Sequence, residues 1–89
     1  MSAYDDALAA MIVRSPKELG VAVRARRKAL TLDQGSLAAK VGVSRQWISD
    51  LERGKPRAEV GLILRTLNAL GLHVWLGMDG PQAVRPGRD

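Results

Sequence analysis

The chain has 89 residues, the length of one small domain. It contains no cysteine, which excludes disulfide bonds and thiolate metal sites as supports for its core. No uninterrupted apolar stretch approaches the about 18 residues that a membrane-spanning helix needs, so we expect a cytoplasmic protein without membrane contact. Phe is absent, and the core must therefore be built from Leu, Val, Ile and Ala, so oligomerisation would add stability.

The formal net charge is +5, and its distribution is more informative than its total. Residues 14–65 carry 12 basic and 5 acidic side chains, whereas the two ends together carry 2 basic and 4 acidic ones. A concentrated positive patch attracts a phosphate backbone and releases its condensed counterions. The region therefore favours a nucleic-acid partner over the alternative of an ordinary solvated surface.

The first expected element lies in residues 1–14, which form either a short helix capped by Ser2 or a frayed end. A clearer signal follows, because the sequence from Ser15 to Glu18 reads as a capping box with proline at the first helical position. This helix is expected to run to about Ala29. The apolar residues of its buried face are Leu19, Val23 and, as a further candidate, Leu30. The basic residues on its other sides are Arg24, Arg26, Arg27 and Lys28.

Residues 33–54 predict two short helices joined by one tight turn. Asp33 and Ser44 are natural N-caps, since their side-chain oxygens can accept hydrogen bonds from free amides of the first turn. Gly42 suits the corner, where the chain leaves the first helix with positive φ. The apolar residues expected on the shared buried face are Leu37, Ala38, Val41, Ile48 and Leu51. This is the geometry of a helix-turn-helix, whose second helix is presented to the DNA major groove.

A further helix is predicted over residues 58–70. It begins after Gly54-Lys55-Pro56, which ends the previous helix, and Gly71 closes it. Its apolar residues at core spacing are Val60, Ile63, Leu64, Leu67 and Leu70.

Residues 72–77 change to a period of two, which is the pattern of a short strand. A lone strand leaves its backbone amides and carbonyls unpaired. The simplest solution is the same strand of a second copy, paired antiparallel across a two-fold axis. The alternative is a coil that folds back over its own core. The predicted dimerisation residues are Leu72, Val74, Trp75 and Leu76. Residues 78–89 are rich in proline and glycine and are expected to form a flexible tail.

The run VSRQWISDLERGKP resembles the recognition helix and following loop of the XRE/Cro family of helix-turn-helix proteins. From Ser15 to Leu76 the chain is most similar to the HipB-like antitoxins of bacterial toxin–antitoxin operons, through the segments SPKELG, VRARRKAL, ISDLERGKP and LRTLNALGLHVWL. The resemblance implies an all-α, lambda-repressor-like bundle of four to five helices. Residues 15–71 would be the DNA-binding domain, and a short C-terminal β-strand, 72–77, would pair across a dimer.

The resemblance also implies a function. A HipB-like homodimer represses its own operon by binding palindromic operator DNA in the bacterial cytoplasm, on the nucleoid. It neutralises a HipA-type serine/threonine kinase, and the complex binds the operator more tightly than the dimer alone. The alternative is a stand-alone phage-type repressor or a restriction–modification controller protein without a toxin partner, although these usually lack the C-terminal strand. The short tail lacks the bulky apolar end that some antitoxins insert into their kinase.

The residues predicted to read bases lie at the start of the second helix of the motif. Arg45 suits the O6 and N7 acceptors of guanine, and Gln46 suits N6 and N7 of adenine. Ser49, one turn further, faces the same groove. Asp50 either accepts a hydrogen bond from a cytosine amine or orients Arg45 or Arg53. Two copies spaced by about one helical turn (roughly 34 Å) would read a palindrome.

The residues predicted to contact the DNA backbone are Gln34, Ser44, Trp47, Lys55 and Arg57. Gln34 resembles the family glutamine that contacts the backbone and braces the recognition helix. Trp47 has two interpretations of equal weight: its indole packs on a thymine methyl or donates to a phosphate, or it covers the helix over 33–42. The charged and polar members could instead be solvated surface residues. Glu52 and Arg53 are expected to make structural interactions at the end of the recognition helix.

The sequence does not indicate an enzyme. The single histidine, His73, lies on the predicted strand, with no cysteine in the chain and no clustered carboxylates beside it. Neither a metal site nor a nucleophilic triad can be assembled from these residues. We therefore expect no catalytic residue, no metal and no cofactor.

Overall fold

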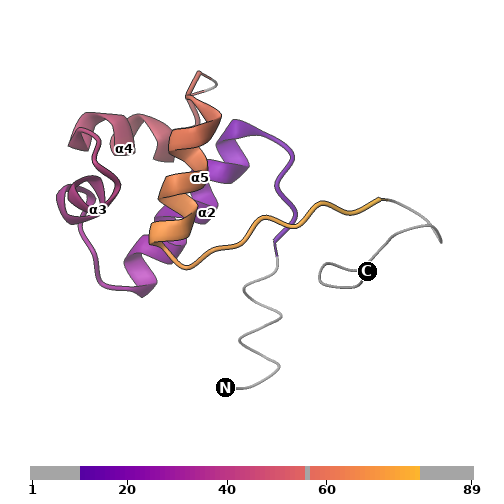
Figure 1. Ribbon diagram of the computed structural model, residues 1–89, viewed down its shortest axis with the longest axis horizontal. Coiled ribbons are helices and arrows are strands. Elements are labelled where there is room, and N and C mark those ends of the chain that lie inside the picture. Colours follow the sequence, from indigo (N-terminus) through magenta and orange to yellow (C-terminus); the bar gives the residue numbers. More distant parts are fainter. Residues whose placement is uncertain (1–10, 56, 79–89) are drawn as a thin grey trace.

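The computed structural model describes residues 11–55 and 57–78. Within them the chain forms four helices: α2 (Pro16–Ala29), α3 (Gln34–Val41), α4 (Arg45–Glu52) and α5 (Val60–Ala69). In Figure 1, α3 and α4 lie at one side of the bundle, and α5 crosses in front of α2. The all-α helix-turn-helix fold is confirmed. The expected short helix within 1–14 falls mostly outside the described residues, and its last four residues, 11–14, have no regular secondary structure. The expected tail lies outside them from residue 79 onwards.

Side-chain caps set the start of the first three helices. The hydroxyl of Ser15 accepts from the backbone N–H of Glu18 at 3.1 Å, as the capping box predicts. The carboxylate of Glu18 accepts from the N–H of Arg14 at 2.5 Å, one residue earlier than the N-cap amide. The carboxylate of Asp33 caps α3 and the hydroxyl of Ser44 caps α4, so both predicted N-caps are confirmed.

The core forms where the two helices of the motif meet α2 and α5. Ala38 and Ile48 are buried, and Gly42 turns the chain between them with φ +87°. Only a residue without a Cβ adopts that φ at low cost, which is why the corner carries glycine. The buried apolar cluster consists of Val23, Leu37, Ala38, Val41, Ile48, Leu51, Leu67 and Leu70. The predicted buried face of residues 33–54 is therefore confirmed.

The predicted core face of α5 is partly wrong. Val60 is 68% exposed and Leu64 is 48% exposed, whereas Leu67 and Leu70 are buried. The buried stripe turns toward Thr66, whose hydroxyl donates to the carbonyl of Leu62 at 2.8 Å and so enters the core satisfied. Because α5 carries apolar residues on more than one side, its sequence alone does not show which of them face the core. On α2, Leu19 is only half-buried and Leu30 is exposed, because the helix already ends at Ala29.

Residues 72–78 form neither helix nor strand in the single chain. Leu72 is half-buried and packs against the core, but the next apolar residues leave it: Val74, Trp75 and Leu76 are 53%, 68% and 89% exposed. Figure 1 shows this segment running away from the end of α5. The alternative of a coil folded back over its own core is therefore wrong beyond Leu72, and strand pairing with a second copy stays a prediction. No helix in the described part of the chain is long and apolar enough to cross a membrane.

A close approach that the sequence analysis missed joins α2 to the end of α4. A Cβ placed on Gly20 would lie 2.6 Å from the carbonyl oxygens of both Leu51 and Glu52. These atoms belong to the backbone of the recognition helix and cannot move aside without shifting that helix. Gly20 therefore sets how closely α2 packs against α4.

We expect Gly20→Ala to destabilise the fold by about 2–3 kcal/mol, because the added methyl group overpacks a backbone contact. Thermal unfolding followed by circular dichroism measures the change. Gly61→Ala is the matched control: a Cβ on Gly61, in α5, meets no atom within 4 Å. That change should stabilise the protein by roughly 0.5–1 kcal/mol through helix propensity. Equal effects of the two substitutions would contradict the assigned role of Gly20.

Candidate nucleic-acid interface

The exposed start of α4 carries the predicted base-reading residues. Arg45 and Gln46 are exposed in its first turn, while Ser49 and Asp50 are half-buried one turn further. The spacing of the four residues places them on neighbouring parts of one helical surface. The structure therefore brings the predicted base-reading residues together.

Two of these side chains, those of Gln46 and Asp50, are joined to each other and to Arg53 at the end of α4. Nε2 of Gln46 donates to Oδ1 of Asp50 at 2.9 Å, and Nη2 of Arg53 donates to the same oxygen at 2.6 Å. The hydrogen bonds from Arg53 and then from Gln46 hold the pKa of the Asp50 carboxyl below its ordinary value. Asp50 therefore contacts Arg53 and not Arg45, while its contact with a cytosine amine stays a prediction. No other described residue bonds to the Gln46 side chain, so its amide oxygen and second N–H remain for a ligand, and these are the groups that pair with adenine.

Arg45 differs from its neighbours. Its side chain forms no hydrogen bond or ion pair with any residue that the structure describes. An exposed guanidinium at the start of the helix keeps all five N–H donors for a ligand.

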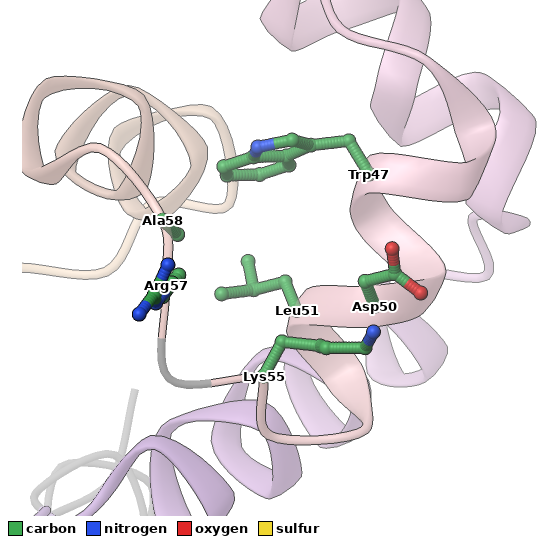
Figure 2. A pocket seen from close by; sticks show the side chains of 6 residues that line it. All are labelled: Trp47, Asp50, Leu51, Lys55, Arg57 and Ala58. Carbon is green, nitrogen blue, oxygen red and sulfur yellow. The ribbon is translucent and has the colours of Figure 1, made fainter.

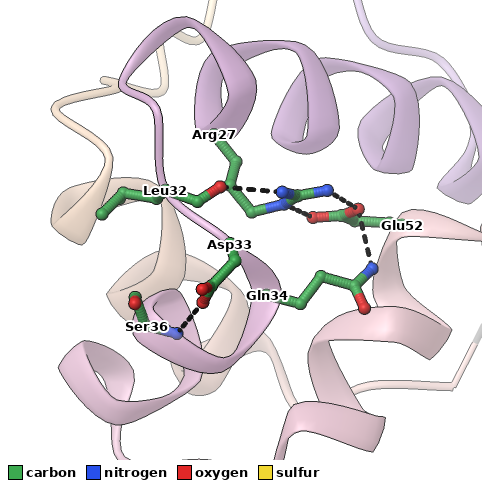
Figure 3. A network of polar contacts seen from close by, with 6 residues as sticks. All are labelled: Arg27, Leu32, Asp33, Gln34, Ser36 and Glu52. Atoms are coloured by element: carbon green, nitrogen blue, oxygen red, sulfur yellow. Dashed lines mark hydrogen bonds and ion pairs between the residues drawn. The ribbon is translucent and has the colours of Figure 1, made fainter.

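A buried polar network joins α4 to α2 and α3 (Figure 3). The guanidinium of Arg27, on α2, donates to both carboxylate oxygens of Glu52, on α4, at 2.6 and 3.0 Å. The exposed fractions of the two side chains are only 9% and 3%. Arg27 also donates to the carbonyl of Leu32 at 2.8 Å, and Gln34, at the start of α3, donates to Oε1 of Glu52 at 3.1 Å. One carboxylate therefore fixes α2, α3 and α4 relative to one another.

The charges in this network stabilise each other. Burial raises the pKa of the Glu52 carboxyl, but the hydrogen bonds from Arg27 and Gln34 outweigh burial and leave the pKa below its ordinary value. The hydrogen bond to Glu52 raises the pKa of Arg27 against the effect of burial. Glu52 was expected to make a structural interaction, and the structure confirms it. Gln34 links α3 to α4 through its hydrogen bond to Glu52, as a residue that braces the recognition helix would. Its contact with a phosphate stays a prediction.

Three of the remaining predicted backbone contacts, Trp47, Lys55 and Arg57, line one hollow beside α4 (Figure 2). Trp47 is half-buried and packs against the core, and it shares a hollow with Asp50, Leu51 and the loop residues Lys55, Arg57 and Ala58. Its ring is directed toward the chain that leads into α5, whereas sequence reasoning places it either on DNA or over α3. Lys55 and Arg57 are exposed at this hollow. Ser44 uses its hydroxyl to cap α4 through the N–H of Trp47 at 3.0 Å.

Several basic residues within 14–65 make structural contacts inside the protein and do not add to a surface for DNA. Nε of Arg26 donates to the carbonyl of Leu70 at 2.8 Å, and Nη1 of Arg65 donates to the carbonyl of Val41 at 3.1 Å. Both close the carbonyl end of a helix, where a cation also interacts favourably with the helix dipole. Arg27 is buried in the network with Glu52. Sequence reasoning missed these roles, because each arginine reaches an element that is distant in sequence.

Comparison with known proteins agrees with the geometry. The family described as helix-turn-helix domain matches residues 18–74. The uncharacterized HTH-type transcriptional regulator y4mF of Sinorhizobium fredii is 40% identical over 62 residues, which cover 70% of this chain and 82% of the relative.

Solved structures extend the likeness to the fold. HipB in the HipB-O4 20mer complex matches with a TM-score of 0.69 and 25% identity, over 75% of this chain and 94% of HipB. HipB in the HipA-HipB-O2-O3 complex matches with the same values. The restriction-modification controller protein C.AhdI from Aeromonas hydrophila has a TM-score of 0.61 and 29% identity, over 65% of this chain and 84% of C.AhdI. The chain therefore belongs to the XRE-type helix-turn-helix domain family and is a transcriptional regulator.

Proposed function

We propose that this protein is a sequence-specific repressor that binds palindromic operator DNA as a homodimer and reads it with α4. The observation that carries the proposal is the exposed start of α4, where Arg45, unpaired among the described residues, lies beside a Gln46 already oriented by Asp50. Base readout needs side chains held in a defined direction on a rigid element. The network of Arg27, Gln34 and Glu52 supplies that rigidity, because it fixes the recognition helix on α2 and α3.

Each reading residue has a specific task in the proposal. Arg45 forms a bidentate pair with guanine, and Gln46 pairs with adenine through the amide groups that Asp50 leaves free. Ser49 approaches the same groove. Asp50 orients Gln46 and Arg53 through Oδ1, and its second oxygen, Oδ2, can still accept from a cytosine amine.

Phosphate contacts on either side of the groove would position the domain without reading sequence. Gln34 and Ser44 lie at the N-terminal ends of α3 and α4, where free backbone amides also favour an anion. Lys55 and Arg57 lie beyond the C-terminal end of α4 and are exposed. The predicted contacts thus come from both ends of the recognition helix.

The homodimer rests on the segment after α5. Val74, Trp75 and Leu76 are apolar and exposed in the single chain, which is a large apolar surface to leave in water. Pairing this segment with a second copy buries these side chains and satisfies the backbone groups together. Val60 and Leu64, exposed on α5, add to the apolar surface available to a second copy.

We expect Val74→Pro to weaken the dimer, because proline removes a ladder donor from the pairing strand. Analytical ultracentrifugation over a range of concentrations measures the dissociation constant. Pro81→Ala, a change in the expected tail, is the control that should leave the constant unchanged. A Val74→Pro variant as dimeric as the wild type would place the interface on another surface.

We further propose that the protein is the antitoxin of a HipBA-like module and holds a HipA-type kinase inactive. The fold match to HipB, including HipB in the HipA-HipB-O2-O3 complex, supports this reading. The second candidate is a stand-alone repressor or a controller protein without a toxin, and the match to C.AhdI favours it. A pull-down from the native host distinguishes them. A retained kinase-like protein encoded beside this gene supports the antitoxin, and a homodimer without a stoichiometric partner supports the stand-alone regulator.

Selection from a pool of random duplexes tests the DNA-binding proposal itself. The expected product is a palindrome whose half-sites lie about one helical turn apart, with guanine and adenine contacts assigned to Arg45 and Gln46. Recovery of unrelated sequences without a shared motif would contradict sequence-specific binding.

A further inference from the structure

Trp47 occupies a position that the base-reading and dimer proposals leave unexplained. It is the one large apolar residue in the first turn of α4, where Arg45 and Gln46 are exposed. Its backbone N–H is fixed by the Ser44 hydroxyl at 3.0 Å, and its ring is half-buried against the core. Figure 2 shows the ring reaching away from α4 toward Ala58 and the chain that enters α5. The ring is therefore directed from the recognition helix toward the segment that follows it.

That segment has little backbone support. The N–H groups of Gly54 and Lys55 still donate to carbonyls of α4, at 3.0 and 3.1 Å. For Arg57 and Ala58 the structure shows no backbone hydrogen bond to another described residue. The next backbone bond is accepted by Glu59, from the N–H of Ile63 in α5. Among the described residues, side-chain contacts rather than backbone hydrogen bonds are left to hold Arg57 and Ala58, and the Trp47 ring is the largest group lining the hollow that they share.

The same hollow carries free positive charge. Lys55 and Arg57 line it and are exposed, and neither forms an ion pair with a residue in the described part of the chain. Asp50 also lines it, but its carboxylate accepts from Gln46 and Arg53 and is thereby partly neutralised. The two cations are exposed and are thus available to a phosphate.

We propose that Trp47 is a positioning residue that holds the Arg57 segment against α4 and so fixes a phosphate contact at a set distance from the base-reading face. The inference rests on the proposed DNA binding and adds a coupling between the loop and the recognition helix. Without the ring, the positive charge of Arg57 remains, but its position relative to α4 is no longer constrained. An arginine that is not pre-positioned contributes less to a defined phosphate contact, because it must be ordered on binding.

The salt dependence of DNA binding tests the coupling, since its slope reports the number of phosphates neutralised. The probe is a radiolabelled duplex of random sequence, long enough for two half-sites, measured by filter binding between about 50 and 200 mM salt. Arg57→Ala should make the slope of log K against log salt shallower by about 0.9 per protomer. Trp47→Ala should reproduce that change, and the double variant should show no further loss. Trp47→Phe, which keeps an aromatic ring, should retain most of the wild-type slope.

Leu32→Ala is the matched control. Leu32 is also half-buried and packed against the core, but it lies outside the hollow, so its truncation should leave the slope unchanged. An unchanged slope in Trp47→Ala overturns the proposal. Additive losses in the double variant also overturn it, because Trp47 would then contact DNA independently of Arg57. Should Trp47→Ala not fold, Trp47→Leu keeps apolar bulk on α4 without the ring and must show the same loss of slope. These failures all leave wild-type DNA binding intact, whereas a wild-type protein that does not bind the duplex overturns the proposed function as well.

Discussion

Replacing Glu52 with glutamine is expected to lower the free energy of unfolding by about 3–5 kcal/mol, because it leaves a buried guanidinium without its counter-charge. Arg27 reaches both oxygens of Glu52 and is almost fully enclosed, so water cannot replace the lost carboxylate. A loss of this size is a large part of the roughly 5–15 kcal/mol that stabilises a typical domain. Urea denaturation followed by circular dichroism measures it.

The matched control is Glu59→Gln, which neutralises an exposed carboxylate just before α5. It should change stability by no more than about 0.5 kcal/mol. The double variant Arg27→Met, Glu52→Leu removes both charges and should recover much of the loss, since apolar residues of similar size often replace a buried ion pair without penalty. Similar stabilities for Glu52→Gln and Glu59→Gln would show that the network contributes little.

The same network predicts the direction of the pH dependence. The folded-state pKa of Glu52 lies below its ordinary value of 4.5. Its contribution to stability is therefore fully present above that ordinary value and is lost as the pH falls through the folded-state pKa. Between pH 7 and 3 the wild type should lose more stability than Glu52→Gln, which has no carboxyl to protonate. Parallel pH profiles of the two proteins would contradict this assignment.

Replacing Arg45 and Gln46 together with alanine is expected to abolish operator preference while leaving salt-sensitive, non-specific binding largely intact. Each bidentate pair contributes about 1–3 kcal/mol of discrimination per half-site. Two residues in two half-sites then carry at least about 4 kcal/mol, so the ratio of operator to random-sequence affinity should fall roughly a thousandfold or more. Competition binding with the selected palindrome and a random duplex measures this ratio.

Lys28→Ala is the charge-matched control for Arg45. It removes one exposed cation from the end of α2 and can weaken binding to both duplexes, but it should leave their ratio unchanged. A double variant that still prefers the palindrome would show that α4 does not read the bases. A preference lost together with all non-specific binding would instead indicate that the fold or the phosphate contacts had failed.

The sequence predicted the helices well because their boundaries are local. Ser15, Asp33 and Ser44 cap the helices they precede. Gly42 marks the corner of the motif, because glycine adopts the positive φ of that corner at low cost. These signals need no knowledge of the rest of the molecule. The recognition of the motif and of its buried face followed from the same local pattern.

The features that sequence reasoning missed depend on which surfaces meet. Gly20 has the same sequence signature as any helical glycine, and its importance comes only from two carbonyls of α4 that lie beside it. Arg26 and Arg65 resemble surface cations, although each closes a helix distant in sequence. Val60 and Leu64 fit a core spacing, yet α5 turns a different side inward. Tertiary packing decides the roles of all these residues, and the pattern of residue types along the chain does not show which surfaces pack together.

The unequal burial of the two tryptophans gives the chain a built-in optical readout. Trp47 is half-buried beside the recognition helix, and Trp75 is 68% exposed in the segment after α5. No other tryptophan is present in the sequence to obscure them. Intrinsic fluorescence therefore separates the two proposed contacts: association of two copies should shift the emission of Trp75 to shorter wavelength, while DNA should quench Trp47. Single Trp→Phe variants assign each signal, so assembly and DNA engagement can be followed in one unlabelled sample.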